Sequence, residues 1–482
     1  MIDFRPILFV LGVLLTTLAV TMVVPAIADL AVGNPDWQVF ATSATVTFFI
    51  GMSLVLAFRA RRFTVSVHQT FVLTTAAWIV LTGFAALPFT FSALGLSYAD
   101  AYFEAMSGLT TTGSTVIRGL DTSPPGILLW RALLQWLGGI GIVVMAIAVL
   151  PFLGVGGMQL FRSESSDQSD KAVPRAAQLA ASITVVYFAL TVVWALMLWA
   201  AGMTQFEAVC HAMTTIATGG YSTVDGSIGQ FNNATIDVVI TVGMIAGSLP
   251  FVLYLTAMRG DLKSLISDSQ VQWFLGMAAA IIAVMMLWNW SALNEPPLAA
   301  LRYAAFNVVS VMTGTGYSST DYGLWGGFAM SVMFFLMFVG GCTGGTTGGI
   351  KIFRFQVLFS TARVQIGQII RPHGVFVAHY NRKPIPDSVT SAVLGFYFMF
   401  FAAFAMVALA LALHGYDFVT SISGAATAVA NVGPGLGDVI GPTGNFASFD
   451  DSAKWIMSAA MLLGRLELFT VLVLFLPSFW RR

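Results

Sequence analysis

Thr110-Thr111-Thr112-Gly113-Ser114 has three counterparts farther along this 482-residue chain, spaced about a hundred residues apart. They are Ala217-Thr218-Gly219-Gly220-Tyr221, Thr313-Gly314-Thr315-Gly316-Tyr317 and Ala430-Asn431-Val432-Gly433-Pro434. Each glycine turn follows an apolar helical stretch and precedes a stretch long enough to cross a membrane. Recurrence of one local pattern at a regular interval indicates repeated structural units. The sequence therefore predicts four related units around a common axis.

The composition places these turns in a membrane protein. Hydrophobic residues make up 57% of the chain and charged residues only 9%, with a mean hydropathy of +0.84, far from the usual composition of soluble domains. A helix that crosses the roughly 30 Å hydrocarbon layer needs about 20 apolar residues. Ten stretches fit: 7–29, 37–58, 67–90, 126–153, 176–201, 233–257, 269–290, 326–361, 388–413 and 453–479.

The basic residues predict the orientation. With the N-terminus inside, 17 of the 22 lysines and arginines fall on the cytoplasmic side, and Arg465 lies within a span. Basic loops resist translocation, so both termini are expected in the cytoplasm. The two cysteines, Cys210 and Cys342, lie within or beside apolar stretches and predict neither a disulfide framework nor a metal cluster. Only four basic residues are assigned to the outside: Arg118, Arg131, Arg302 and Lys454.

Each glycine turn lies in a long, partly apolar loop on the external side. Before it runs a stretch of about a dozen residues, too short to span and suited to a re-entrant half-helix. Six residues before the four aligned glycines stand hydroxyl residues: Ser107, Thr214, Ser310 and Thr427. Aligning the fourth unit on Gly435 would instead place Val429 at this position, so Gly433 is the better match.

These features predict an all-α integral membrane protein with about ten membrane-spanning helices and four re-entrant pore half-helices. Four helix, pore loop, helix repeats would surround one pseudo-fourfold pore, preceded by two extra helices. The predicted divisions are an N-terminal piece, 1–62, and pore repeats 63–165, 166–265, 266–380 and 381–482.

The four turns suit the binding of a cation by backbone oxygens. Carbonyl dipoles can replace the hydration shell of K+ without the tight hold of a carboxylate, and glycine allows the backbone angles that turn successive carbonyls toward one axis. The half-helices would also direct their negative dipole ends at the axis. The predicted filter residues are Thr111, Thr112, Gly113, Thr218, Gly219, Gly220, Gly314, Thr315, Gly316, Asn431, Val432 and Gly433.

Four acids follow the turns, one per repeat: Asp121, Asp225, Asp321 and Asp438. They would either raise the cation concentration at the pore mouth or serve simply as solvated loop charges. We keep them outside the core site.

The stretch 326–361 contains a glycine-rich segment that cannot hold a straight helix, because each glycine costs up to about 1 kcal/mol relative to alanine. A loop at 340–350, inside the membrane and below the filter, could gate conduction; the alternative is a glycine patch for close helix packing. The predicted gating residues are Gly340, Gly341, Cys342, Thr343, Gly344, Gly345, Thr346, Thr347, Gly348, Gly349, Lys351 and Arg465.

Arg465 is a costly residue within the tenth span, at about 2.5–3.5 kcal/mol on insertion scales. It would either face the pore below the filter or pair with an acid such as Glu104 or Glu207. The sequence leaves both possibilities open.

With four glycine turns in four such repeats, the whole chain resembles the superfamily of potassium transporters that includes the bacterial Trk and Ktr systems and the plant high-affinity transporters. The two leading helices and the turn Asn431-Val432-Gly433-Pro434-Gly435-Leu436-Gly437 resemble its TrkH branch most. The resemblance implies that the four aligned glycines form a potassium filter, that 340–350 is an intramembrane gating loop and that Arg465 faces the pore. Glycine rather than serine at position 113 favours potassium over sodium.

The resemblance also implies a homodimer in the bacterial inner membrane, gated by a cytoplasmic nucleotide-binding subunit of the TrkA type. K+ would be the ion bound and transported, with no organic cofactor in this chain, no enzymatic activity and no nucleic-acid partner; membrane lipid surrounds it. The leading hypothesis is channel-like potassium uptake. The alternative is transport of potassium coupled to protons or sodium, for which the titratable candidates are Asp100, Glu104, Glu207 and His211.

Overall fold

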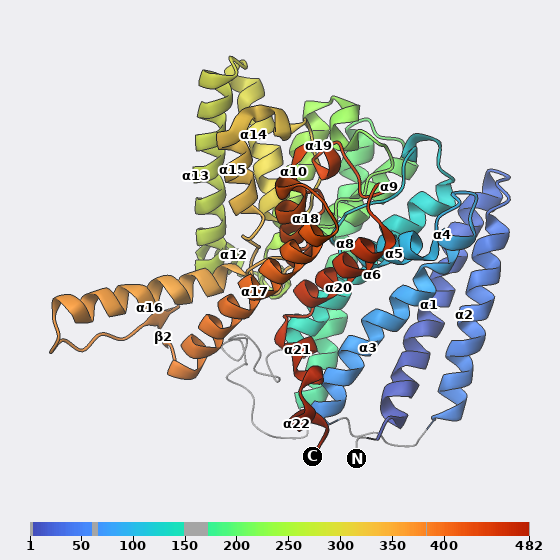
Figure 1. The fold of residues 1–482 in the computed structure, drawn as a ribbon, viewed down its shortest axis with the longest axis horizontal. Helices are drawn as coiled ribbons and strands as arrows, with labels where there is room; N and C mark the ends of the chain where they lie inside the picture. The colour runs from blue at the N-terminus through green and yellow to red at the C-terminus, as the bar shows by residue number, and fades with distance from the viewer. Residues whose placement is uncertain (1–2, 60–65, 149–171, 382, 482) are drawn as a thin grey trace.

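The computed structural model describes residues 3–59, 66–148, 172–381 and 383–481. In this part of the chain nearly all regular structure is helical, and one short antiparallel pair, β1 (His379–Tyr380) and β2 (Lys383–Pro384), is the only sheet. The long helices run roughly side by side, and both termini lie at the same end of the bundle (Figure 1).

Two helices precede the repeats, α1 (Arg5–Ala31) and α2 (Trp37–Ala57). They pack closely because glycines meet at their crossing: a Cβ atom added to Gly12 would lie 2.7 Å from the Gly51 carbonyl oxygen, and one added to Gly51 would lie 2.9 Å from that of Gly12. Small residues allow this approach in membrane helices, where packing rather than the hydrophobic effect drives association.

Four groups of helices follow, each with a half-helix between two flanking helices. The first is α3 (Val67–Ala85), α4 (Leu87–Phe91), α5 (Tyr98–Leu109), η1 (Leu120–Thr122) and α6 (Pro125–Ala148). The second is α8 (Ala172–Ala200), α9 (Gln205–Ile216), η3 (Ser227–Phe231), α10 (Ala234–Ser248) and α11 (Phe251–Met258), and α12 (Leu262–Ser267) leads onward.

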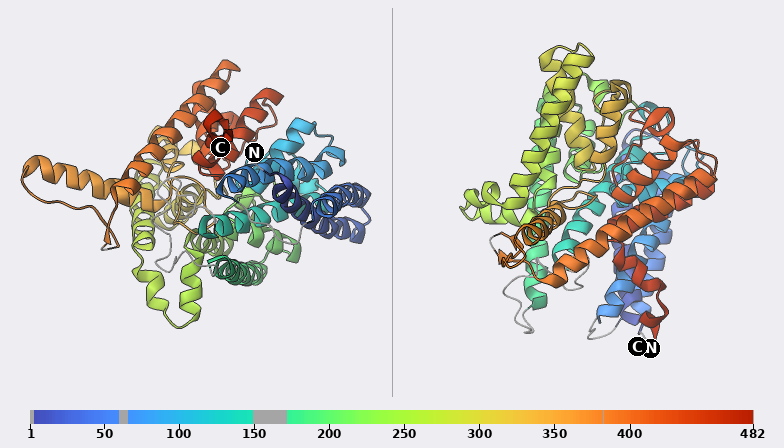
Figure 2. Two further views of the ribbon diagram at one scale, coloured as in Figure 1. Left: turned by 90° about the horizontal axis from the view of Figure 1, so that it is seen from below. Right: turned by 60° about the vertical axis from the view of Figure 1, so that its left-hand side comes forward.

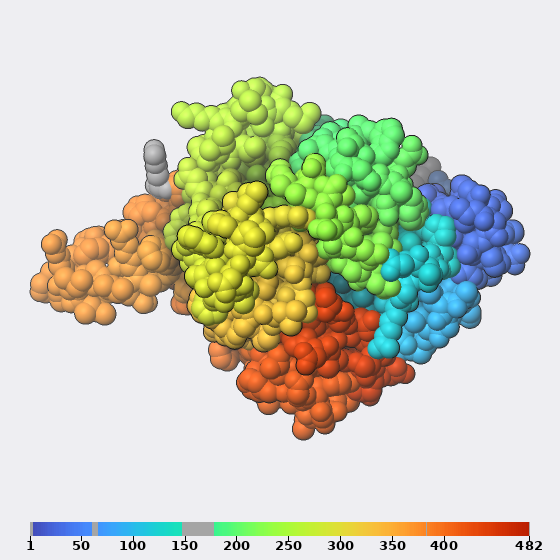
Figure 3. Space-filling view, turned by 90° about the horizontal axis from the view of Figure 1, so that it is seen from above, coloured from blue at the N-terminus to red at the C-terminus, as the bar shows by residue number. Residues whose placement is uncertain are grey.

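The third group is α13 (Ser269–Ala292), α14 (Pro297–Met312), η4 (Tyr322–Trp325), α15 (Gly326–Leu336) and α16 (Ile352–Ile370). The fourth is α17 (Asp387–Leu413), α18 (Phe418–Ala430), α19 (Gly437–Ile440), α20 (Asp451–Arg465), α21 (Phe469–Leu472), η5 (Val473–Phe475) and α22 (Pro477–Trp480). Seen from above, the cyan, green, yellow and red quarters of the chain follow one another around a centre (Figure 3). The half-helices α5, α9, α14 and α18 are thus brought to one axis, as predicted.

Three of the predicted spans are not continuous helices. The stretch 233–257 bends by 95° between α10 and α11, and 453–479 bends by 108° after α20. Pro250, which lacks an N–H group, lies within the first break, and Glu467 and Leu468 adopt positive φ angles of 60° and 21° at the second. By length and composition, the described residues contain seven unbroken spans, or nine if each bent pair counts as one.

The third break is the glycine-rich segment between α15 and α16, so the predicted interruption of 326–361 is confirmed. Beyond it α16 does not continue into the bundle but projects sideways from it, as the views from below and from the side show (Figure 2). The repeat boundaries stay predictions: 62/63 and 165/166 fall outside the described residues, and so do the basic residues Arg61, Arg62, Arg162, Lys171, Arg382 and Arg482.

Candidate functional site: four glycine turns and the loop below them

The four turns share one backbone conformation. Two residues before each aligned glycine the backbone is left-handed, with φ of 52° at Thr111, 51° at Thr218, 65° at Gly314 and 56° at Asn431. The glycines themselves have φ of 90°, 79°, 82° and 112° in chain order. The angles of the four glycines lie beyond the left-handed values near 57° that Thr111, Thr218 and Asn431 adopt, in a region that strongly favours glycine.

The hydroxyl residue found six positions before each glycine has a structural role. Its carbonyl oxygen accepts the N–H of the residue just before the glycine, at 2.9, 2.8, 2.9 and 3.0 Å in the four turns. In two of the turns the hydroxyl also binds the turn: Ser310 donates to the Tyr317 carbonyl at 2.6 Å, and Thr427 accepts from the Gly433 N–H at 2.8 Å. These bonds fix the chain as it leaves each half-helix.

The turns also contact one another in a closed cycle. Each aligned glycine faces the carbonyl oxygen that precedes the aligned glycine of the next repeat. A Cβ atom added to Gly113 would lie 2.3 Å from the Gly219 oxygen, and one added to Gly220 would lie 1.8 Å from the Thr315 oxygen. The corresponding distances are 2.2 Å from Gly316 to the Val432 oxygen and 2.9 Å from Gly433 to the Thr112 oxygen. The last contact returns to the first repeat, and the Ser114 hydroxyl reinforces it by donating to the Gly433 carbonyl at 2.7 Å. The four turns therefore form a ring of backbone groups.

Gly435, the alternative register, does not belong to this ring. Its added Cβ would meet the side chains of Ile440, at 2.4 Å, and Ser423. The choice of Gly433 made from the sequence agrees with the geometry.

A cavity of about 70 Å³ lies against the ring. All four aligned glycines line it, together with polar groups from the outer loops such as Ser114, Ser318 and Asp225. The ring thus borders a small polar cavity, which we call the vestibule.

An ion pair that the sequence analysis missed supports the first two turns. Arg131 on α6 and Glu104 on α5 are both buried and pair at 2.8 Å. Arg131 also donates to the Ser222 carbonyl at 2.8 Å and lies 4.0 Å from the centre of the Tyr221 ring, while Glu104 accepts the Val116 N–H at 2.9 Å. The residues just after Gly113 and Gly220 are therefore tied to one buried pair.

Gln135 lies one turn of α6 farther on and contacts the second glycine turn directly. Its side-chain amide donates to the Gly219 carbonyl and accepts from the Tyr221 N–H at 3.1 Å. The sequence did carry a signal for these contacts, because Arg131 and Gln135 lie in the apolar stretch 126–153. Such groups are costly in a membrane unless they find partners. The assignment of Arg131 to an external loop was wrong.

Lys454, also assigned to the outside, is buried at the start of α20 and pairs with Asp100 on α5 at 2.5 Å. The other titratable candidates for ion coupling are engaged too. Glu207 caps its own helix by bonding Thr204, and the buried His211 contacts the Glu207 carbonyl at 2.9 Å and the Ser222 hydroxyl at 3.1 Å.

The glycine-rich segment is a buried, non-helical loop directly below the ring. The Thr346 N–H bonds the Gly247 carbonyl at 2.9 Å and its hydroxyl donates to the Ile216 carbonyl at 3.0 Å, while the Cys342 N–H bonds Ser248 at 3.0 Å. On the opposite side a Cβ at Gly348 would lie 2.4 Å from the Ala430 carbonyl. The loop therefore bridges the ends of the second and fourth half-helices.

Charged residues lie against one side of this loop. Lys351, also buried, donates from Nζ to the Thr347 carbonyl. Arg465 is 3% exposed, and none of its guanidinium nitrogens has a hydrogen-bond partner among the described residues. With Gly348, Lys351 and Glu467 it lines a small cavity of about 20 Å³.

The suggested partners of Arg465 are therefore wrong: Glu104 pairs with Arg131, and Glu207 caps its own helix. Glu467, two residues after Arg465 in the chain, pairs instead with the buried Arg354. The break after α20 places Arg465 in the last helical turn, facing the loop.

Three of the four acids that follow the turns accept hydrogen bonds from the loops around them. Asp225 accepts the N–H groups of Gly119 and Leu120 at 3.1 and 3.0 Å, Asp121 accepts from Gln230 at 2.9 Å, and Asp321 accepts the Gly323 N–H at 2.9 Å. Asp438 is exposed. Asp225 alone among the four lines the vestibule.

Comparison with known proteins agrees with this architecture. The family model described as TrkH, cation transport protein, matches residues 36–482. This chain belongs to the TrkH family. The Trk system potassium uptake protein TrkI of Halomonas elongata is 46% identical over 481 residues, covering 99% of this chain and 97% of that protein. TrkH of Escherichia coli K12 is 36% identical, covering 99% of both chains.

Among solved structures, the potassium transporter TrkH from Vibrio parahaemolyticus superimposes with a TM-score of 0.92 at 33% identity, covering 100% of both chains. Family membership and the predicted fold are thus confirmed: the chain is a multi-pass membrane protein of a transporter family and not of an enzyme family.

Proposed function

We propose that this protein takes up potassium across the bacterial inner membrane, with both termini in the cytoplasm, and that the ring of four glycine turns is its selectivity filter. The observation that carries the proposal is the closed cycle of glycine-to-carbonyl contacts among the four repeats. A ring of carbonyl dipoles binds a dehydrated cation firmly enough for entry and weakly enough for exit. The names of its relatives, potassium uptake proteins of Trk systems, favour K+ as the ion.

The filter carbonyls would come from the twelve residues predicted from the sequence, with those of Thr112, Gly219, Thr315 and Val432 forming the layer between neighbouring repeats. The half-helices α5, α9, α14 and α18 end at this ring, and their negative dipole ends favour a cation there. A membrane potential of 100 mV contributes about 2.3 kcal/mol for each inward charge. Uptake through a channel therefore needs no ATP hydrolysis in this chain.

The loop 340–350 is proposed as the gate. Its hydrogen bonds to Gly247, Ser248 and Ile216 hold it under the ring, and opening requires these bonds to break. Arg465 would limit the residence of cations below the filter by electrostatic repulsion. We further propose a homodimer with one pore per subunit, in which a cytoplasmic nucleotide-binding subunit moves the loop through the basic internal segments.

Reconstituted protein should pass K+ and Rb+ in liposomes under an inside-negative potential. Absence of both fluxes from folded protein would refute potassium uptake. Reversal potentials measured across a proton or sodium gradient separate the two mechanisms. A channel follows the potassium gradient alone, whereas a coupled transporter shifts its reversal potential with the second gradient.

A further inference from the structure

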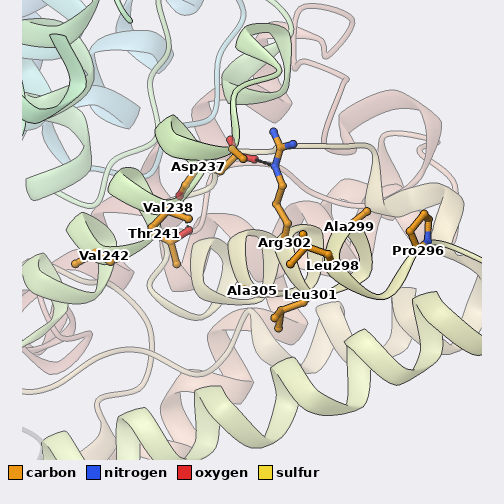
Figure 4. Close-up of a pocket in the computed structure, with 11 residues that line it drawn as sticks. Asp237, Val238, Thr241, Val242, Pro296, Leu298, Ala299, Leu301, Arg302 and Ala305 are labelled. Carbon is orange, nitrogen blue, oxygen red and sulfur yellow. Dashed lines mark hydrogen bonds and ion pairs between the residues drawn. The ribbon is translucent and has the colours of Figure 1, made fainter. Parts of the chain in front are cut away.

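An apolar groove lies on the outer half of the molecule between α10 and α14, far in the sequence from the gating loop. Its cavity measures about 710 Å³. Figure 4 shows α10 and α14 contributing opposite walls. The lining residues are Ala234, Asp237, Val238, Thr241, Val242, Pro296, Leu298, Ala299, Leu301, Arg302 and Ala305.

The groove is open at the surface of the single chain. Val238, Val242, Leu298 and Leu301 are all exposed. The Thr241 hydroxyl is satisfied by the Asp237 carbonyl at 2.7 Å, which leaves the wall below the ion pair without a free polar group among the described lining residues. Such a surface suits a hydrocarbon chain.

The depth of the groove matches one leaflet. Both helices begin at the external face, since α14 continues inward to the filter turn at Gly314. Along α10 the lining runs from Ala234 to Val242, a rise of about 12 Å at roughly 1.5 Å per residue. Half of the hydrocarbon layer is about 15 Å thick. The groove therefore reaches from the external interface almost to the midplane.

Within the first two turns of α10 and α14, the groove carries a charged group with free donors. Arg302 bonds Asp237 through Nε alone, at 2.7 Å, and its two terminal nitrogens point away from this carboxylate (Figure 4). They have no hydrogen-bond partner among the described residues. The Asp237 side chain is 3% exposed, against 24% for Arg302, so the carboxylate faces inward and holds the guanidinium at the mouth. A planar guanidinium fork with two free nitrogens fits a phosphate group.

We propose that this groove binds one glycerophospholipid of the outer leaflet, with an acyl chain along Val238, Val242 and Ala305 and the phosphate on the terminal nitrogens of Arg302. The bound lipid would fill the space between the third pore half-helix and α10. The inner end of α10 holds the gating loop through Gly247 and Ser248. The site thus places a lipid between two elements that reach the proposed pore.

Native mass spectrometry of the purified full-length protein, titrated with dioleoyl phosphatidylglycerol, tests this assignment. Arg302→Gln should weaken binding of the first lipid about tenfold, which corresponds to about 1.4 kcal/mol. The double variant Arg302→Gln with Asp237→Asn should show the same loss without leaving a buried carboxylate unpaired. Ala305→Phe should also reduce binding, because the ring occupies the groove while the arginine remains.

Arg118→Gln is the matched control, since Arg118 is an exposed external arginine away from the groove, and it should bind lipid like the parent protein. Unchanged lipid binding in both Arg302→Gln and Ala305→Phe would overturn the assignment. The same spectra report the oligomeric state. If these variants lose dimer instead of lipid, the groove holds a second copy of the chain and the lipid proposal is wrong. Each variant must keep the parent's melting temperature within a few degrees. If Arg302→Gln alone does not, the double variant with Asp237→Asn is used in its place.

Discussion

Substitution of the four filter glycines by alanine should produce effects in a defined order. The added methyl group would lie 1.8 Å from the opposing carbonyl oxygen at Gly220, 2.2 Å at Gly316, 2.3 Å at Gly113 and 2.9 Å at Gly433. Contacts under 3.0 Å require movement, so Gly220→Ala must displace the Thr315 carbonyl by about 1 Å, whereas Gly433→Ala needs almost none. The displacement of the opposing carbonyl should therefore be largest in Gly220→Ala, smaller in Gly316→Ala and Gly113→Ala, and smallest in Gly433→Ala.

A left-handed backbone angle adds a cost of roughly 1–2 kcal/mol for any L-residue. This cost is common to all four positions and does not affect selectivity by itself. We expect Gly220→Ala to reduce the preference for K+ over Na+ about tenfold, or about 1.4 kcal/mol, since one ring carbonyl no longer faces the ion. Gly433→Ala should lose at most a few-fold.

Gly415→Ala supplies the control for backbone strain. Gly415 has φ of 86°, close to that of Gly316, and nothing lies within 4 Å of its added Cβ. The assay is the bi-ionic reversal potential with K+ and Na+ across proteoliposomes, with melting temperature as the check on folding. Equal selectivity in folded Gly220→Ala and Gly433→Ala, or a comparable loss in Gly415→Ala, would refute the reasoning.

Three further substitutions probe the surroundings of the filter. Arg465→Ala should increase Rb+ flux several-fold by removing a fixed positive charge from the cavity below the loop, and Arg465→Lys should not; a decrease in the alanine variant contradicts the assigned role. Thr346→Val loses the hydroxyl's hydrogen bonds to the Ile216 carbonyl and the Thr218 hydroxyl, of about 1 kcal/mol each, and leak flux without a cytoplasmic partner should rise about tenfold or more, whereas Thr346→Ser should stay closed. Glu104→Gln leaves a buried guanidinium unpaired, so the free energy of unfolding should fall by about 3–5 kcal/mol; a melting temperature equal to that of the exposed-acid control Asp438→Asn would show that the pair is not stabilising.

The local requirements of the filter could be predicted from the sequence. Glycine tolerates positive φ angles best, so a glycine at a single position is enough to indicate such a backbone angle. This holds for Gly113, Gly220, Gly316 and Gly433. The hydroxyl residue six positions earlier gave the register, although its bond runs through the backbone carbonyl in all four turns.

The supporting contacts could not be predicted in this way. Arg131 pairs with Glu104, 27 residues away, and Gln135 reaches Gly219, 84 residues away. Neither distance follows from a periodic pattern. From the sequence one could infer only that a charge and an amide within an apolar stretch need partners. For Arg465 the suggested partners were wrong, because Glu104 and Glu207 are engaged elsewhere.

The sequence by itself determined the membrane class, the number of glycine turns and the position of the glycine-rich break in the helix, because hydropathy and backbone permissiveness are properties of short segments. Tertiary structure alone decided the order of the ring, the bends after α10 and α20, and the isolation of the Arg465 guanidinium beside the loop. These features depend on which surfaces meet when helices more than a hundred residues apart pack around one axis, and that packing is a property of the whole chain.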